Sequence, residues 1–137
     1  MRGDLTEAGE PLVNYEVLLQ SVAARARVHA RHERFSIRDL SIPTPERMRA
    51  ILGAIAGATS SARPVYVHCW GGVGRTGTVV ACLLIESGFT PEEAITQIAQ
   101  KWTVMDKRYM QPRSPQAPEQ FAFIRDWRRA TQPSSSK

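Results

Sequence analysis

One stretch of the sequence combines residue types that together could carry out chemistry on a phosphate group. A short apolar run of strand character, residues 65–67, is followed by Cys69, by glycines at three of the next five positions, and by Arg75 and Thr76. Glycines allow successive backbone N–H groups to point inward, and the start of a helix adds partial positive charge. This anion cradle would hold a thiol at its base and a guanidinium at its rim. The pattern therefore predicts phosphoryl transfer to cysteine.

The surroundings of Cys69 suit a thiolate. A free cysteine has a pKa of about 8.5, and backbone donors, a helix N-terminus and Arg75 would all lower it. A bound phosphate would receive a two-pronged contact from Arg75, which lysine cannot supply. In the transition state the same donors would surround the oxygens that carry the negative charge. The alternative, that Cys69 is only a small buried residue, leaves the glycine-rich flank and the arginine unexplained.

A nucleotide-binding loop is a second interpretation of the glycines. That motif requires lysine immediately before its serine or threonine. Here Arg75 or Gly77 occupies the candidate position, and the cysteine would have no role. We therefore exclude this interpretation.

The order His68-Cys69, five residues, Arg75-Thr76-Gly77 resembles the signature loop of the cysteine-dependent protein tyrosine phosphatases. The short chain is most similar to the compact, dual-specificity-like branch. Residues 37–43 resemble the general-acid loop of that branch, and residues 113–120 are similar to a Ser-Pro segment before the last helix of bacterial members. The resemblance covers roughly residues 35–127.

The resemblance implies that Asp39 is the general acid. The leaving oxygen of a phosphoester needs a proton, which a positioned carboxylic acid can donate. In the second step the same carboxylate would take a proton from the attacking water. Asp106 is the competing acid, and a plain turn residue before Pro43 is the structural alternative for Asp39.

The resemblance also implies roles for the other residues of the loop. Thr76 is expected to stabilise the departing thiolate; its structural alternative, the N-cap of the helix 79–85, is compatible with that role. His68 is expected to orient the loop from behind rather than to transfer protons. Substrate binding is assigned to the five spacer residues and the arginine: Trp70, Gly71, Gly72, Val73, Gly74 and Arg75.

Three further residues have weaker assignments. Arg113 and Gln120 match the family pattern loosely and are kept as candidates for contacting substrate or orienting water. Cys82 lies in the predicted helix after the loop, where it is either a buried core residue or a redox partner of Cys69.

Hydrophobic periodicity predicts the helices and strands that must position these residues. We expect helices that start near Tyr15, at Thr44-Pro45, after the loop, at Thr90-Pro91 and after Pro118, with Thr90 and Glu93 forming a capping box. Strands are expected at 34–38 and 65–69. The helix 79–85 is apolar on most faces and is therefore expected to be central.

This alternation predicts an α/β fold, with a central, mainly parallel sheet flanked by helices and the signature loop between a strand and the central helix. We expect one domain over residues 1–132 and a frayed tail at 133–137. Two strands are few for such a sheet, so we also expect that an N-terminal segment of the domain is absent.

The composition limits the domain organisation, the location and the partners that we expect for this protein. The chain has 137 residues, a formal net charge of +5 and two cysteines, which indicates one domain without a disulfide framework. Neither a signal peptide nor a membrane span is apparent, so we expect a cytoplasmic location. The arginines are scattered, so neither nucleic acid nor membrane is an expected partner. Neither a cofactor nor a metal is expected, whereas phosphate, sulfate or vanadate should occupy the loop.

The predicted function is hydrolysis of phosphotyrosine in proteins or peptides, with phosphoserine and phosphothreonine left open. Phosphoinositide-selective relatives tend to carry lysines in the five-residue spacer, and this spacer has none. The alternatives are an inositol-phosphate or phosphoinositide phosphatase and a catalytically silent phosphate-binding module. A sulfurtransferase or arsenate reductase would also use a loop cysteine, but Asp39 and the Arg-Thr-Gly ending argue against it.

Overall fold

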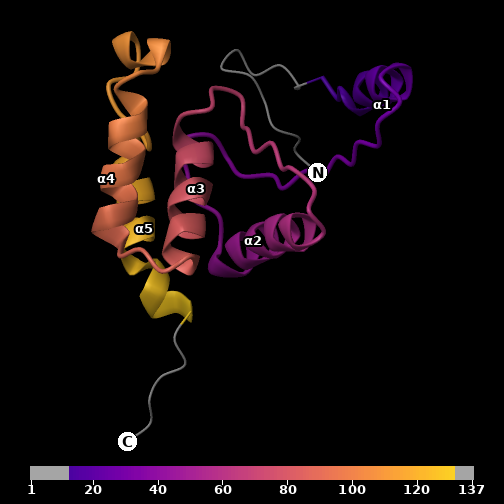
Figure 1. Cartoon of the computed structure of the whole chain (residues 1–137). Coiled ribbons are helices and arrows are strands. Elements are labelled where there is room, and N and C mark those ends of the chain that lie inside the picture. The colour runs from indigo at the N-terminus through magenta and orange to yellow at the C-terminus, as the bar shows by residue number, and fades with distance from the viewer. Residues whose placement is uncertain (1–12, 132–137) are drawn as a thin grey trace, which may run out of the picture. The chain divides into compact units, whose positions relative to one another are not determined.

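The computed structural model describes residues 13–131, and side chains through Trp127 (Figure 1). The chain divides into two compact units, one ending at Ser36 and one beginning at Ile37. The predicted tail at 133–137 lies outside the described residues. No helix in the described part is long and apolar enough to cross a membrane.

The first unit contains one helix, α1 (Glu16–Arg25). It begins one residue after the predicted start, where the Asn14 side chain accepts the Glu16 N–H at 3.0 Å. The Gln20 side chain donates to the Ala30 carbonyl at 3.0 Å and holds the segment that follows the helix.

The second unit begins with the loop that carries Asp39 and continues into α2 (Pro45–Ser60). The predicted start is confirmed, because the Thr44 hydroxyl accepts the Arg47 N–H at 3.2 Å and Pro45 occupies the first helical position. The apolar stripe of α2 is buried as predicted: Met48, Ile51, Leu52 and Ile55.

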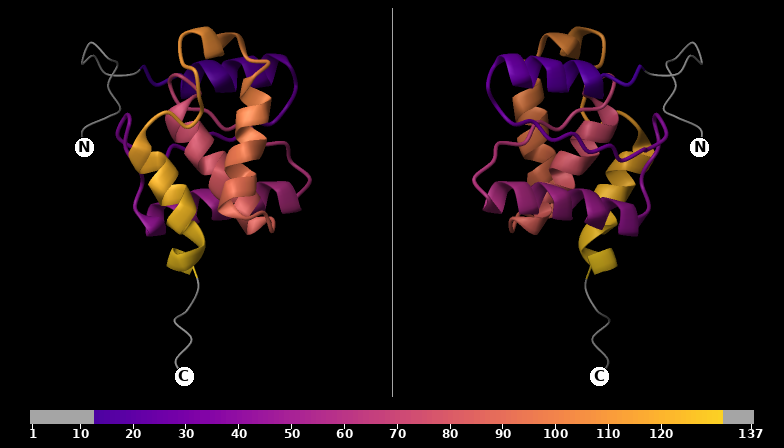
Figure 2. Two further views of the ribbon diagram at one scale, coloured as in Figure 1. Left: turned by 90° about the vertical axis from the view of Figure 1, so that its left-hand side faces the viewer. Right: turned by 90° about the vertical axis from the view of Figure 1, so that its right-hand side faces the viewer.

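Helix α3 (Gly74–Glu86) is the centre of the second unit. It contacts α2, α4 (Pro91–Trp102) and α5 (Pro118–Thr131), and α4 and α5 also pack on each other. Figures 1 and 2 show α4 and α5 beside α3, with α2 crossing near its C-terminal end. The Trp127 ring N–H donates to Glu86 at 2.7 Å and fastens α5 to α3. The predicted central place of this helix is confirmed.

The predicted capping box of α4 is also confirmed, because Thr90 and Glu93 exchange hydrogen bonds between side chain and backbone. The stretch after α4 contains one short 3₁₀ helix, η1 (Asp106–Tyr109). The buried Trp102 ring donates to the Gln111 carbonyl at 2.8 Å and anchors this stretch to α4.

The prediction of an α/β fold with a central sheet is wrong, because no residue in 13–131 belongs to a strand. The segments 34–38 and 65–69 run between helices as coil, and Tyr66 is 88% exposed. A strand's backbone groups must pair with a neighbouring strand, so a strand-like local pattern forms no sheet when no partner segment lies alongside. The helices, by contrast, satisfy their hydrogen bonds internally and form as predicted.

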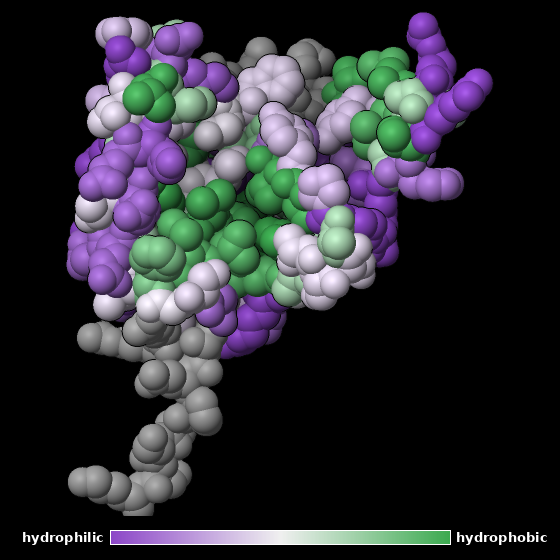
Figure 3. All heavy atoms as spheres, in the orientation of Figure 1, coloured by the Kyte–Doolittle hydropathy of each residue, from purple (hydrophilic) through white to green (hydrophobic). Residues whose placement is uncertain are grey.

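Apolar side chains remain grouped on one face of the second unit. Figure 3 shows them gathered over α3 and the adjoining part of α2. Val80, Leu83 and Leu84 of α3 are half-buried. Within the second unit α3 packs against α2, α4 and α5, and its Gly77 lies against the segment 114–115.

Two glycine substitutions test this packing. A Cβ on Gly77 in α3 would lie 2.4 Å from the Ser114 hydroxyl and 3.2 Å from the Pro115 nitrogen, whereas a Cβ on Gly53 in α2 meets nothing within 4 Å. Gly77→Ala should therefore lower the free energy of unfolding by about 1–3 kcal/mol. Gly53→Ala, the matched control, should raise it by about 0.5–1 kcal/mol. Urea denaturation measures both, and equal effects would contradict the packing described.

Candidate active site

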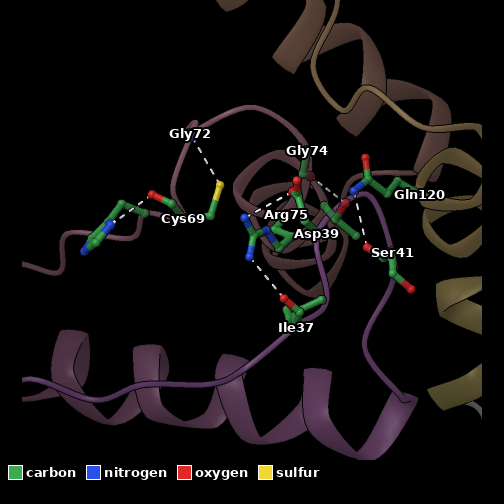
Figure 4. Close-up of polar contacts among 10 residues, drawn as sticks. Ile37, Asp39, Ser41, Cys69, Gly72, Gly74, Arg75 and Gln120 are labelled. Carbon is green, nitrogen blue, oxygen red and sulfur yellow. Dashed lines mark hydrogen bonds and ion pairs between the residues drawn. The ribbon is translucent and has the colours of Figure 1, made fainter. Parts of the chain in front are cut away.

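The loop after Cys69 folds back over its own sulfur (Figure 4). Gly72 has a φ of +70°, a conformation that glycine adopts without strain, and its N–H donates to Cys69 Sγ at 3.2 Å. The loop then enters α3 directly at Gly74, with Val73 as the residue before the helix. The first turn of α3 therefore begins five residues after the cysteine, as an anion cradle requires.

The surroundings of Cys69 lower the pKa of its thiol from the ordinary value of a free cysteine. Partial burial is the largest single influence and raises the pKa, because it disfavours the charged form. The side chain and backbone N–H of Thr76, the N–H of Gly72 and the charge of Arg75 together outweigh it. The predicted stabilisation of the thiolate by backbone donors and Arg75 is thus present in the structure.

Arg75 joins the loop to the segment that carries Asp39. One terminal nitrogen of its guanidinium donates to the Ile37 carbonyl at 3.1 Å, and the other forms an ion pair with Asp39 Oδ1 at 3.1 Å (Figure 4). The Arg75 side chain is only 10% exposed, whereas that of Asp39 is 55% exposed. The nucleophile and the proposed acid are therefore connected through a single side chain.

Two buried donors at the start of α3 have no hydrogen-bond partner: Arg75 Nε and Thr76 Oγ1. The Thr76 hydroxyl is nevertheless close enough to Cys69 Sγ to lower the pKa of that thiol, so Arg75 Nε is the donor with no interaction of its own. A buried donor without a partner costs about 1–3 kcal/mol. An oxyanion in the cradle would satisfy such donors, and the donor set fits phosphate.

Asp39 occupies a tight turn. The Ser41 N–H donates to the Arg38 carbonyl at 3.1 Å, and Leu40 has a φ of +59°. A non-glycine residue in this conformation costs about 1–2 kcal/mol. Asp39 therefore lies in a turn, and it also forms the ion pair with Arg75. No ion pair joins Asp106 to Arg75 in the described residues.

Gln120 is fully buried and is hydrogen-bonded to the loop that carries Asp39. Its side-chain nitrogen donates to the Ser41 carbonyl at 3.3 Å, and its oxygen accepts the N–H groups of Gln116 and Ala117 at 3.2 and 3.1 Å. Figure 4 shows it between Ser41 and the start of α3. Because the Gln120 side chain has no surface exposed to solvent, its contacts are with protein groups, and it supports the loop that carries Asp39.

The other residues predicted for the site are Arg113, His68, Trp70 and Thr76. The Arg113 guanidinium lies over the Phe121 ring, 5.2 Å from its centroid. The exposed His68 has its Nδ1 3.1 Å from the Cys69 carbonyl oxygen. Trp70 is 64% exposed. The N-cap alternative for Thr76 is wrong, because α3 begins at Gly74.

One charged residue at the loop was not predicted from the sequence. Lys107, in η1, donates a hydrogen bond from Nζ to the Gly71 carbonyl. Lys107 lies 36 positions after Gly71 in the chain, so no local pattern could have indicated the contact.

A family profile described as "PTP-SAK: Swiss Army Knife protein, DSP-PTPase phosphatase domain" matches residues 9–135. The chain belongs to this family. It is therefore a member of the cysteine-dependent, dual-specificity-like phosphatases, as the signature loop predicts. The match extends over both compact units of the chain.

Cys82 differs from Cys69 in its burial and in the direction in which its surroundings shift the thiol pKa. It is fully buried in α3, and burial, with a smaller contribution from the Glu86 charge, raises its pKa to about 12. Both cysteines are free thiols. In this member of the PTP-SAK family the structure thus presents one activated thiol and one inert one.

Alkylation by iodoacetamide should distinguish the two thiols. The rate for Cys69 should follow a titration with a midpoint below that of a free cysteine, since only the thiolate reacts. Thr76→Val should move that midpoint upward, because it removes a donor that favours the thiolate. Cys82→Ser should leave the profile unchanged. A midpoint unaffected by Thr76→Val would contradict the role given to the hydroxyl.

Proposed function

We propose that this protein hydrolyses phosphomonoesters through a cysteinyl-phosphate intermediate, with Asp39 as general acid. The observation that supports it most strongly is the cradle itself. A thiol whose pKa is lowered by Thr76, Gly72 and Arg75 shares the start of α3 with a buried Arg75 Nε that has no partner. Membership of the dual-specificity-like phosphatases agrees with this chemistry.

In the first step the Cys69 thiolate attacks phosphorus and the bond to the leaving oxygen breaks. The protonated Asp39 carboxyl gives its proton to that oxygen. The guanidinium of Arg75 and the N–H groups of the loop hold the phosphoryl oxygens, which carry the developing charge. A bound phosphate would share Arg75 with Asp39, which already lies 3.1 Å from it.

In the second step water attacks the phosphorus of the cysteinyl phosphate. The Asp39 carboxylate takes a proton from the water, and the bond between sulfur and phosphorus breaks. The sulfur leaves as a thiolate, and the Thr76 hydroxyl, which has no other partner, would donate to it. The products are inorganic phosphate and the starting form of the enzyme.

Phosphotyrosine in proteins or peptides is the proposed first substrate, with phosphoserine and phosphothreonine as further candidates. A cysteine at the base of a cradle suits a long, flat side chain, and Cys69 is half-buried while Trp70 stands exposed beside it. The argument from a spacer without lysine is weakened, however, because Lys107 brings an ammonium to the loop.

Replacement of the nucleophile tests the mechanism directly. Cys69→Ser should reduce turnover of para-nitrophenyl phosphate by about a thousandfold or more, because the hydroxyl is a far poorer nucleophile than the thiolate. The wild type should remain active in EDTA and lose activity to vanadate. Cys82→Ser is the matched control and should keep full activity. An inactive wild type would instead favour a phosphate-binding module, and an active Cys69→Ser variant would exclude the covalent route.

The dependence on the leaving group tests Asp39. Asp39→Asn should slow hydrolysis of an alkyl phosphate by roughly 100-fold or more, because that leaving oxygen needs a proton. The effect on para-nitrophenyl phosphate should be much smaller, since nitrophenolate leaves without one. Asp106→Asn, the control at the competing acid, should leave both rates unchanged. Equal losses for both substrates in Asp39→Asn would assign the proton donor to another group.

A further inference from the structure

Lys107 puts a positive charge on the rim of the signature loop, close to the nucleophile. Its Nζ donates to the Gly71 carbonyl and lies 3.8 Å from the point where a Cβ on Gly72 would be. The Gly72 N–H in turn donates to Cys69 Sγ at 3.2 Å. Standard bond lengths then place the ammonium within about 10 Å of the sulfur.

The turn that carries Lys107 is held in place by backbone and core contacts. The Lys107 carbonyl accepts the N–H groups of Met110 at 3.0 Å and Gln111 at 2.8 Å. The carbonyl of Gln111 accepts the ring N–H of the buried Trp102 at 2.8 Å. The backbone under the lysine is thus fixed to the end of α4, so the charge is directed to the loop.

The ammonium retains capacity to bind an anion. It has three N–H donors, and the structure shows one of them used, on Gly71. Lys107 forms no ion pair with any carboxylate of the described residues, and it is exposed to solvent. A compact ammonium in this position can receive a phosphate without first breaking a salt bridge.

We propose that Lys107 forms a second phosphate subsite, and that the site therefore also takes, besides phosphotyrosine, small polyols carrying a second phosphate close to the one that is hydrolysed. This inference rests on the proposed phosphatase function. The chemistry is that of an inositol polyphosphate, free or as a lipid headgroup. Adjacent ring positions hold two phosphates a few ångströms apart, and an ammonium bound to Gly71, two residues after the nucleophile, lies near enough to contact the second one. A phosphotyrosine side chain instead holds its phosphate a full side-chain length from neighbouring acidic residues.

Steady-state kinetics with matched substrates test the proposal. The wild type should show a higher kcat/KM for inositol hexakisphosphate than for inositol monophosphate. Lys107→Ala should raise KM for the hexakisphosphate by about tenfold, since a charge-assisted contact is lost, and should leave the monophosphate and para-nitrophenyl phosphate nearly unchanged. Lys107→Arg should restore most of the loss. The control is Lys101→Ala, which removes an exposed lysine of α4 and should change neither substrate.

The loop-shaping alternative makes a different prediction. If Lys107 only orients the Gly71 carbonyl, Lys107→Ala should reduce activity on monophosphates and polyphosphates equally, and that result would overturn the proposal. So would the absence of any preference for the polyphosphate in the wild type. A Lys107-dependent preference confined to phosphotyrosine peptides with acidic neighbours would also overturn it. Phosphatidylinositol bisphosphate in phosphatidylcholine vesicles, compared with free inositol polyphosphate, shows which source of the headgroup is used.

A binding measurement separates failure of this inference from failure of the proposed function. Calorimetry with inositol hexakisphosphate on Cys69→Ser and on Cys69→Ser/Lys107→Ala needs no turnover. About tenfold weaker binding in the double variant supports the subsite even if the wild type hydrolyses nothing. Equal binding by the two variants overturns the subsite even if the wild type is an active phosphatase.

Discussion

The ion pair between Arg75 and Asp39 is the interaction on which the site depends. A guanidinium that is 90% buried contacts the Asp39 carboxylate and the Ile37 carbonyl at 3.1 Å each, while its Nε remains unpaired. One side chain thereby holds the acid loop beside the signature loop and still offers a donor to an anion. Arginine can do both because its donors lie in a rigid plane and point in different directions.

Close packing beneath the loop explains why this segment needs small residues. A Cβ on Gly74 would lie 2.8 Å from the Gln120 side-chain nitrogen, and one on Gly77 would lie 2.4 Å from the Ser114 hydroxyl. The same two partners hold the loop from outside α3. Ser114 donates to the Val73 carbonyl at 2.7 Å, and Gln120 reaches Ser41 in the acid loop. The support of the cradle thus comes from the segment before α5, packed against the first turn of α3.

The charge around the cradle is assembled from separate parts of the chain. Arg75 stands at the start of α3, and Lys107 reaches the Gly71 carbonyl from η1. The two cations differ in burial. The buried guanidinium lowers the pKa of the Cys69 thiol, whereas an exposed ammonium is screened by salt.

The features that the sequence alone determined are those whose hydrogen bonds are local. Thr44 and Thr90 cap α2 and α4 through contacts three residues away, and the Gly72 N–H reaches the Cys69 sulfur across the same separation. The helix positions, the cradle and the family could therefore be predicted. The general acid was indicated by resemblance, and its contact with Arg75 appears only in the structure.

Tertiary structure decided everything that joins distant segments. Strand-like patterns at 34–38 and 65–69 indicated a sheet, but a strand forms only beside a partner, and these segments are coil. The contacts of Gln120 with Ser41 and of Lys107 with Gly71 span 79 and 36 residues. Such pairings depend on how α3, α4 and α5 pack together, which periodicity within a single helix does not encode. The sequence by itself thus specified a cysteine in an anion cradle and indicated Asp39 through the resemblance, whereas only the packing around α3 decided that Asp39 contacts Arg75 and that Lys107 reaches Gly71.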